Sequence, residues 1–120
     1  MTEEPRVGVV VPNPFLHIPV VAAVQASGGR ALDLADPGAA AAAGCTVVIV
    51  DLDALGPDPA PAIRTAADGG ATVVGFAPHA RSERLEAARA AGAIALPRSL
   101  FLQRLPELLA TLLDHGDRGA

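Results

Sequence analysis

The sequence predicts a single α/β domain over residues 1–120, in which five strands alternate with five helices. The most apolar run, residues 47–50, is too short for a buried helix and is rich in β-branched residues, as is typical of a central parallel strand buried on both faces. Ala-rich segments bounded by Gly and Pro separate this run from other short aliphatic runs. Because βα crossovers are right-handed, the strands should form one parallel sheet covered by helices on both faces.

Each expected strand is a short aliphatic run that ends in turn-forming residues. In chain order the five runs are residues 6–11, 30–34, 47–50, 71–76 and 94–96. The second alternates in polarity, which favours a position nearer the sheet edge. Periodicity alone does not determine the order of the strands.

The first two helices are predicted from their capping residues. We expect the first to begin near Pro19, which suits a first-turn position, and to end at residues 27–29. Asp36 is a typical N-cap before Pro37, and the alanine run that follows should form a short helix ended by Gly44.

Three further helices complete the alternation. Residues 62–67 and 83–91 are expected to be helical, with Ser82 as the cap of the second segment. The last helix should begin with Pro106 in its first turn, after a looser segment at 100–104. Its leucines recur at helical spacing on one face, and a polar tail follows from about residue 114. These leucines are Leu105, Leu108, Leu109, Leu112 and Leu113.

Composition excludes several classes of function. The formal net charge of -4 and the lack of a basic stripe argue against nucleic-acid binding. All nine basic residues are Arg, so lysine Schiff-base chemistry and a lysine phosphate clamp are excluded. The single cysteine, Cys45, permits neither an internal disulfide nor a thiolate zinc cluster, and its place beside a core strand favours a buried, inert thiol.

The N-terminus does not resemble a signal peptide, and no apolar run approaches the roughly 20 residues needed to span a bilayer. We therefore expect a cytoplasmic protein that does not enter a membrane. Abundant Ala, Gly, Pro and Arg are typical of a GC-rich bacterial genome.

The most probable place for a functional site is the carboxyl edge of the sheet, where ligands bind in open α/β folds. Asp51 and Asp53 follow the central strand, and their two-residue spacing directs both carboxylates to one side of an extended chain. Asp51 could be a phosphoacceptor, a metal ligand together with Asp53, or a structural cap. For Asp53, a solvated turn residue is the favoured interpretation.

The histidines have no metal-ligand spacing, so we expect no metal site. His79 follows the fourth strand and could pair with Asp51 in acid–base chemistry, although an ordinary hydrogen-bonding role in the loop is the favoured interpretation. His17 is expected to pack or cap, and His115 lies in the tail. Ser82 and Ser99 are interpreted as helix caps, which leaves no obvious nucleophile.

Three stretches in the right order resemble the receiver domains of bacterial two-component response regulators. These are residues 48–53, residues 73–80 and residues 91–99, which include an Ala-Gly-Ala segment before the last strand. The resemblance spans nearly the whole chain. It implies a flavodoxin-like (CheY-like) three-layer sandwich, with a five-stranded parallel sheet in the order 2-1-3-4-5 and five helices.

The resemblance also implies a chemistry, Mg²⁺-assisted phosphoryl transfer to one aspartate, here Asp51. Pro12 and Asn13 stand where the family has the acidic pair that helps to hold the metal. Ala77 replaces the hydroxyl residue after the fourth strand, and Arg98 replaces the lysine after the fifth. We therefore expect a pseudo-receiver in which Asp51 is a vestigial phosphoacceptor.

Our first hypothesis is a non-enzymatic, phosphorylation-independent module that acts through protein contacts, with no cofactor. The alternative is a ligand-binding or catalytic protein that uses a crevice at Asn13, Asp51, His79 and Arg98. A working phospho-receiver at Asp51 is the third possibility.

Receivers of this family often dimerise through the last helix and fifth strand, so the resemblance suggests a homodimer or another protein contact there. Phe101, Leu102 and Leu112 are the candidate residues for this partner surface, because a contiguous exposed apolar patch would mark an interface.

Overall fold

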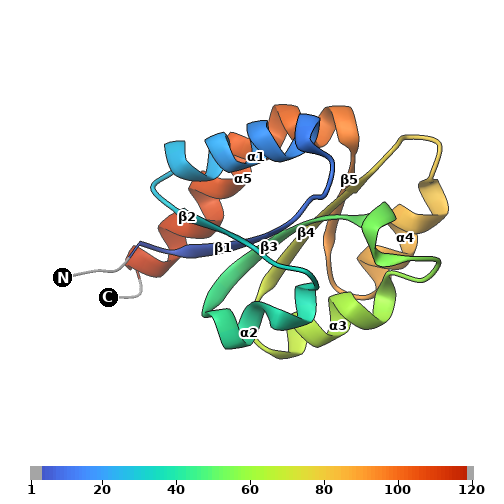
Figure 1. The fold of residues 1–120 in the computed structure, drawn as a ribbon, viewed down its shortest axis with the longest axis horizontal. Helices are drawn as coiled ribbons and strands as arrows, with labels where there is room; N and C mark the ends of the chain where they lie inside the picture. The colour runs from blue at the N-terminus through green and yellow to red at the C-terminus, as the bar shows by residue number, and fades with distance from the viewer. Residues whose placement is uncertain (1–3, 119–120) are drawn as a thin grey trace.

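The computed structural model describes residues 4–118, and side chains within residues 4–113. Five parallel strands form one sheet in the order β2-β1-β3-β4-β5, which confirms the predicted fold class (Figure 1). The strands are β1 (Arg6–Val10), β2 (Arg30–Asp33), β3 (Cys45–Asp51), β4 (Thr72–Ala77) and β5 (Ile94–Pro97).

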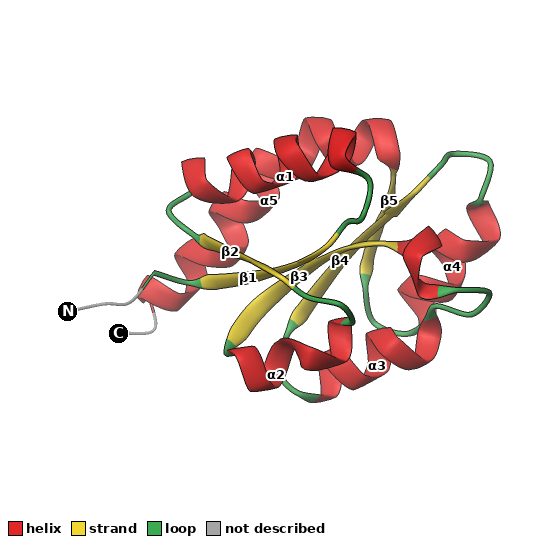
Figure 2. Ribbon diagram, viewed as in Figure 1, coloured by secondary structure: helices red, strands yellow, loops and turns green. Residues whose placement is uncertain are grey.

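Helices cover both faces of the sheet and produce three layers (Figure 2). One face carries α1 and α5, and the other carries α2, α3 and α4. The helices are α1 (Pro14–Ala26), α2 (Ala40–Ala43), α3 (Ala60–Asp68), α4 (Ser82–Ala90) and α5 (Arg98–Arg118), with short 3₁₀ turns η1 (Pro37–Ala39) and η2 (Leu52–Leu55). No helix in the described part of the chain is long and apolar enough to cross a membrane.

The central strand β3 divides the core because its side chains alternate between the two faces. Val47 and Ile49 pack toward α1 and α5, whereas Val48 and Val50 pack toward α2, α3 and α4. All four are almost completely buried. Burial on both faces explains why this segment is continuously apolar rather than alternating.

The start of α1 differs from the sequence prediction. The helix begins at Pro14, and Asn13 is its N-cap, with the side-chain oxygen accepting a hydrogen bond from the Phe15 amide at 2.9 Å. Pro19 lies inside the helix instead of opening it. Pro19 removes the hydrogen bond to the Phe15 carbonyl, and burial of Leu16, Val20 and Val24 against the sheet outweighs this loss.

The start of α5 was also placed too late. The helix begins at Arg98, so Ser99 lies within it rather than capping it, and Pro106 lies in its interior. Phe101, Leu105 and Leu109 form one buried row at four-residue spacing. Burying this row outweighs the backbone hydrogen bond that Pro106 cannot donate.

The capping predictions were otherwise mixed. Asp36 caps η1, with its carboxylate accepting from the Gly38 amide at 2.9 Å, and Gly44 ends α2 in the left-handed conformation. Ser82 is not a cap, because it is the first residue of α4 and follows Arg81, which makes no side-chain cap.

Phe101 belongs to the core. Its ring stacks on Phe76 of β4 with ring centroids 4.4 Å apart and an angle of 22° between the planes. Because Phe101 has no exposed surface, it cannot belong to the candidate partner surface. Leu102 and Leu112 are partly buried against the same cluster.

Candidate functional site

Asp51 lies at the carboxyl end of β3, as the sequence predicts, and is the one buried charged residue in the described part of the chain. Its side chain is 8% exposed. One carboxylate oxygen accepts a hydrogen bond from the Asp53 amide at 3.0 Å, and this bond turns the chain from β3 into η2. An aspartate is suited to this position because its short side chain can bond the backbone two residues ahead.

Burial dominates the electrostatics of Asp51 and raises the pKa of its carboxyl group above the usual value. The hydrogen bond from the Asp53 amide lowers this pKa, while the Asp53 charge raises it. Arg98 and Arg84 also lower it from a distance. The net effect is a carboxyl group that holds its proton more strongly than an exposed aspartate does.

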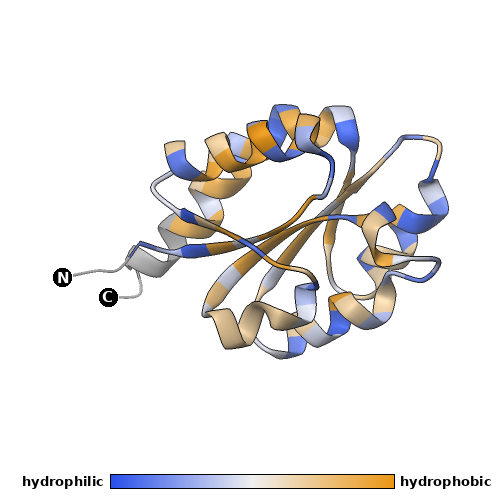
Figure 3. Ribbon diagram, in the orientation of Figure 1, coloured by the Kyte–Doolittle hydropathy of each residue, from blue (hydrophilic) through white to orange (hydrophobic). Residues whose placement is uncertain are grey.

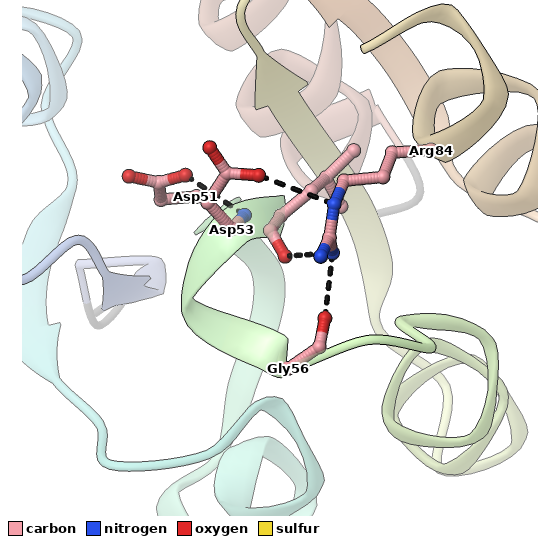
Figure 4. A network of polar contacts seen from close by, with 5 residues as sticks. Asp51, Asp53, Gly56 and Arg84 are labelled. Carbon is pink, nitrogen blue, oxygen red and sulfur yellow. Dashed lines mark hydrogen bonds and ion pairs between the residues drawn. The ribbon is translucent and has the colours of Figure 1, made fainter.

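Arg84 of α4 holds the segment that follows Asp51 (Figure 4). Its Nε lies 3.3 Å from the Asp53 carboxylate. Its Nη1 donates to the Leu52 carbonyl at 3.2 Å and to the Gly56 carbonyl at 2.6 Å. One guanidinium therefore joins both ends of η2 to α4. We call this set, Asp51, Leu52, Asp53, Gly56 and Arg84, the Arg84 cluster.

Leu52 holds the same turn by packing against the sheet. Its side chain is fully buried and packs over Gly75 of β4. A Cβ added at Gly75 would lie 2.7 Å from Leu52 Cδ2, so only glycine leaves room for this leucine. The turn after Asp51 is thus fixed by apolar packing on one side and by Arg84 on the other.

The remaining predicted crevice residues are brought together only in part. Arg98 begins α5 close enough to Asp51 to affect its pKa, but no ion pair joins the two among the described side chains. The Arg98 Nε is buried and finds no hydrogen-bond partner within residues 4–113. Ala77 is the buried last residue of β4.

Two further predicted crevice residues, Asn13 and His79, are exposed. The Asn13 side chain is exposed and is engaged in capping α1. His79 is exposed in the loop between β4 and α4, and nothing in the described part of the chain forms a hydrogen bond with it. Within residues 4–113, no group of three metal-ligating side chains comes together.

A second feature at this edge of the sheet is a hollow of about 490 Å³ between β1, β2 and the first turn of α1. His17 and Asp33 lie on its wall, with His17 Nε2 2.6 Å from Asp33 Oδ1. His17 is therefore neither a core residue nor a cap. The lining residues are Val9, Val10, Val11, Pro12, Pro14, His17, Asp33, Leu34, Ala35 and Ala54.

Sequence reasoning missed Arg84 and the His17–Asp33 pair. Arg84 lies 32 residues from Leu52 along the chain, and His17 lies 16 residues from Asp33. Neither pair has a local spacing that would have indicated the contact.

Comparison with known proteins gives a match at the level of structure only. No family model and no curated protein matches the sequence. A response regulator from Thermotoga maritima is similar, with a TM-score of 0.74 and 18% identity over 93% of this chain and 99% of the other.

A CheY-like receiver domain from Methanospirillum hungatei gives a TM-score of 0.76 at 15% identity, over 98% of this chain and 100% of the other. The BeF3-activated receiver domain of DrrB gives 0.73 at 16% identity, over 93% of this chain and 99% of the other. These matches identify the fold as that of CheY-like receiver domains.

Proposed function

We propose that this chain is a non-enzymatic regulatory module with a receiver fold that acts through protein contacts without being phosphorylated. The observation that supports this proposal is the Arg84 cluster. In it, a fixed guanidinium already satisfies the Asp53 carboxylate and two carbonyls of the turn after Asp51. The turn is therefore held in one conformation by the protein itself.

The donor set around Asp51 also supports the proposal. Mg²⁺ requires several oxygen ligands, usually carboxylates and waters. Asp53 is engaged by Arg84, the Asn13 side chain is engaged by the Phe15 amide, and Pro12 supplies no side-chain oxygen. Ala77 has no hydroxyl to bond a phosphoryl group.

The alternative, a ligand-binding or catalytic crevice at Asn13, Asp51, His79 and Arg98, has less support. The Asn13 side chain is already engaged in capping α1, and His79 is exposed without a hydrogen bond in the described part of the chain. Phosphorylation of Asp51 is the third possibility.

The test is a ¹⁵N-labelled NMR titration with Mg²⁺ and then with beryllofluoride, a phosphoryl mimic. The DrrB receiver domain, solved in its BeF3-activated form, is the positive control. We expect no concerted shifts at the amides of Asp51, Ala77 and Arg98. Saturable shifts at these amides that spread to α4 would overturn the proposal and establish a phospho-switch.

Two variants sharpen this experiment. Arg84→Ala removes the guanidinium, whereas Arg81→Ala removes an exposed arginine at the start of the same helix and serves as the control. If Arg84→Ala alone gains beryllofluoride-dependent shifts, Arg84 is the group that blocks the switch. We also propose that a protein partner binds through α5 and β5. Because Phe101 is buried, the candidate residues for this contact are now Leu102 and Leu112.

A further inference from the structure

The outer face of α1 is apolar. Phe15 is 86% exposed and Ile18 is 68% exposed, and these are the large apolar side chains that stand exposed within residues 4–113. Pro14, Pro19 and Ala22 are exposed on the same helix. The inner face is also apolar, and Leu16, Val20 and Val24 are buried against the sheet. Figure 3 shows α1 as hydrophobic along much of its length.

A helix that is apolar on all sides is normally covered on all sides. Residues 14–26 contain no Asp, Glu, Lys or Arg, and the one ionisable residue, His17, is paired with Asp33. Surface helices of monomeric proteins usually carry charges on their outer face. We infer that the outer face of α1 is covered by a partner in solution.

The charge of α1 and of the whole chain indicates which class of partner would cover this face. A helix that lies on a membrane usually carries Lys or Arg around its apolar face and is drawn to anionic lipids. Here the helix has no cation, and the chain has a net charge of -4, which opposes adsorption to an anionic membrane. The same charge opposes nucleic acid. These features favour a protein partner.

The hollow beside α1 adds a complementary shape. Pro14 and His17 belong both to the helix and to the wall of the hollow, so the exposed apolar residues and the hollow form one continuous surface. Apart from His17 and Asp33, the side chains that line the hollow are apolar. Its volume of about 490 Å³ exceeds that of an apolar cavity of about 150 Å³ that holds a benzene ring.

We propose that this surface binds a second copy of the same chain, with Phe15 of each copy entering the hollow of the other about a two-fold axis. In such a dimer one surface supplies both the protruding side chain and its receptor, as two-fold symmetry requires. Each copy carries a net charge of -4, but α1 has no Asp, Glu, Lys or Arg, and the one carboxylate on the wall of the hollow, Asp33, is paired with His17. Complementary charges, which often select an unlike partner, are absent from α1.

The available area indicates a weak dimer. A buried aromatic side chain contributes about 150–250 Å². Two such rings, with Ile18 and the prolines of both copies, approach the low end of specific interfaces, about 1,200 Å² in total. The proposed dimer rests on the proposed function only in that both involve protein contact. It does not depend on whether Asp51 is phosphorylated.

Sedimentation velocity over a wide concentration range tests this dimer, starting from the protomer mass of 12.0 kDa. We expect the mean mass to rise toward that of two copies. Phe15→Ser and Ala35→Arg should each weaken dimerisation by at least about tenfold, because central anchor residues dominate interface energies. Ala35 is exposed, so its substitution blocks the hollow without affecting the core. Gln25→Ser, exposed at the far end of α1, is the matched control and should have no effect.

Two results would overturn the proposal. One is a wild-type chain that stays monomeric at every concentration. The other is a dimer that Phe15→Ser and Ala35→Arg leave intact, and loss of that dimer in Leu112→Ala would move the contact to α5 and β5. Circular dichroism of each variant separates loss of dimer from loss of fold. Neither result affects the beryllofluoride titration, so the two proposals fail independently.

Discussion

His17 Nε2 lies 2.6 Å from Asp33 Oδ1, so a side chain in the first turn of α1 is joined directly to the last residue of β2. This contact closes one wall of the hollow beside α1. Both side chains have substantial solvent contact, with 32% of His17 and 73% of Asp33 exposed. The pair therefore orients local structure more than it stabilises the domain.

We expect His17→Ala and Asp33→Ala each to lower the free energy of unfolding by less than about 1 kcal/mol, because exposed pairs gain little in water. A double-mutant cycle measured by urea unfolding gives the coupling energy between the two side chains. High salt should reduce it. A coupling energy well above 1 kcal/mol would mean that the pair is shielded from solvent.

The raised pKa of Asp51 predicts a pH dependence of stability. A carboxyl group whose folded pKa exceeds its unfolded value binds its proton more tightly in the folded state. As far as this group is concerned, the free energy of unfolding is therefore highest at low pH. It falls as pH rises from the ordinary pKa of 3.8 through the folded pKa, and it stays at the lower level above that.

Asp51→Asn should therefore be more stable than the wild type at pH 7, while its Oδ1 still accepts the Asp53 amide. The gain should disappear when pH falls below about 3.8, the ordinary pKa. Urea unfolding from pH 3 to pH 7 measures the difference, and Asp68→Asn, exposed at the end of α3, is the control. A variant that is less stable than the wild type at pH 7 would show that the Asp51 charge is compensated.

Arg84→Ala should release the turn after Asp51. The Asp53 carboxylate and the carbonyls of Leu52 and Gly56 lose their shared donor, which costs about 1–3 kcal/mol where such groups are shielded from water. Hydrogen exchange measures the effect as faster exchange at residues 53–56. Arg84→Lys should only partly restore protection, because a single ammonium cannot reproduce the planar guanidinium. Unchanged exchange relative to Arg81→Ala would show that packing alone holds the turn.

Much of the fold could be predicted from the sequence because burial determines the local patterns. The apolar run in β3 indicated a central strand, and the Asp36-Pro37 and Gly44 signals marked the ends of a short helix. The strand order came from the resemblance to receiver domains and not from periodicity. The predictions that helices begin near Pro19 and Pro106 were wrong, because apolar burial outweighs the local preference of proline for the first turn.

The candidate site was predictable only where the backbone alone sets it. Asp51 had to lie at the carboxyl edge because it ends a central parallel strand. Arg84 was not predictable, because its contacts depend on how α4 packs beside η2. Phe101 was assigned to the surface because a leucine-rich helix does not reveal which of its residues meets an aromatic ring on the sheet.

The close approach of Leu52 to Gly75 gives the last prediction. Gly75→Ala would place a methyl group 2.7 Å from Leu52 Cδ2 and 3.1 Å from its Cγ. Leu52 is fully buried and cannot move into solvent, so the overpacking should cost about 1–3 kcal/mol. Amide shifts should appear at Asp51 and Asp53, because Leu52 lies between them.

A double-mutant cycle identifies the cause. Leu52→Ala alone should cost about 2–5 kcal/mol, since it leaves a cavity. In the double variant the new methyl group occupies part of that cavity, so the combined cost should be clearly less than the sum of the single costs. Additive costs in urea unfolding would show that Gly75→Ala does not act through its contact with Leu52.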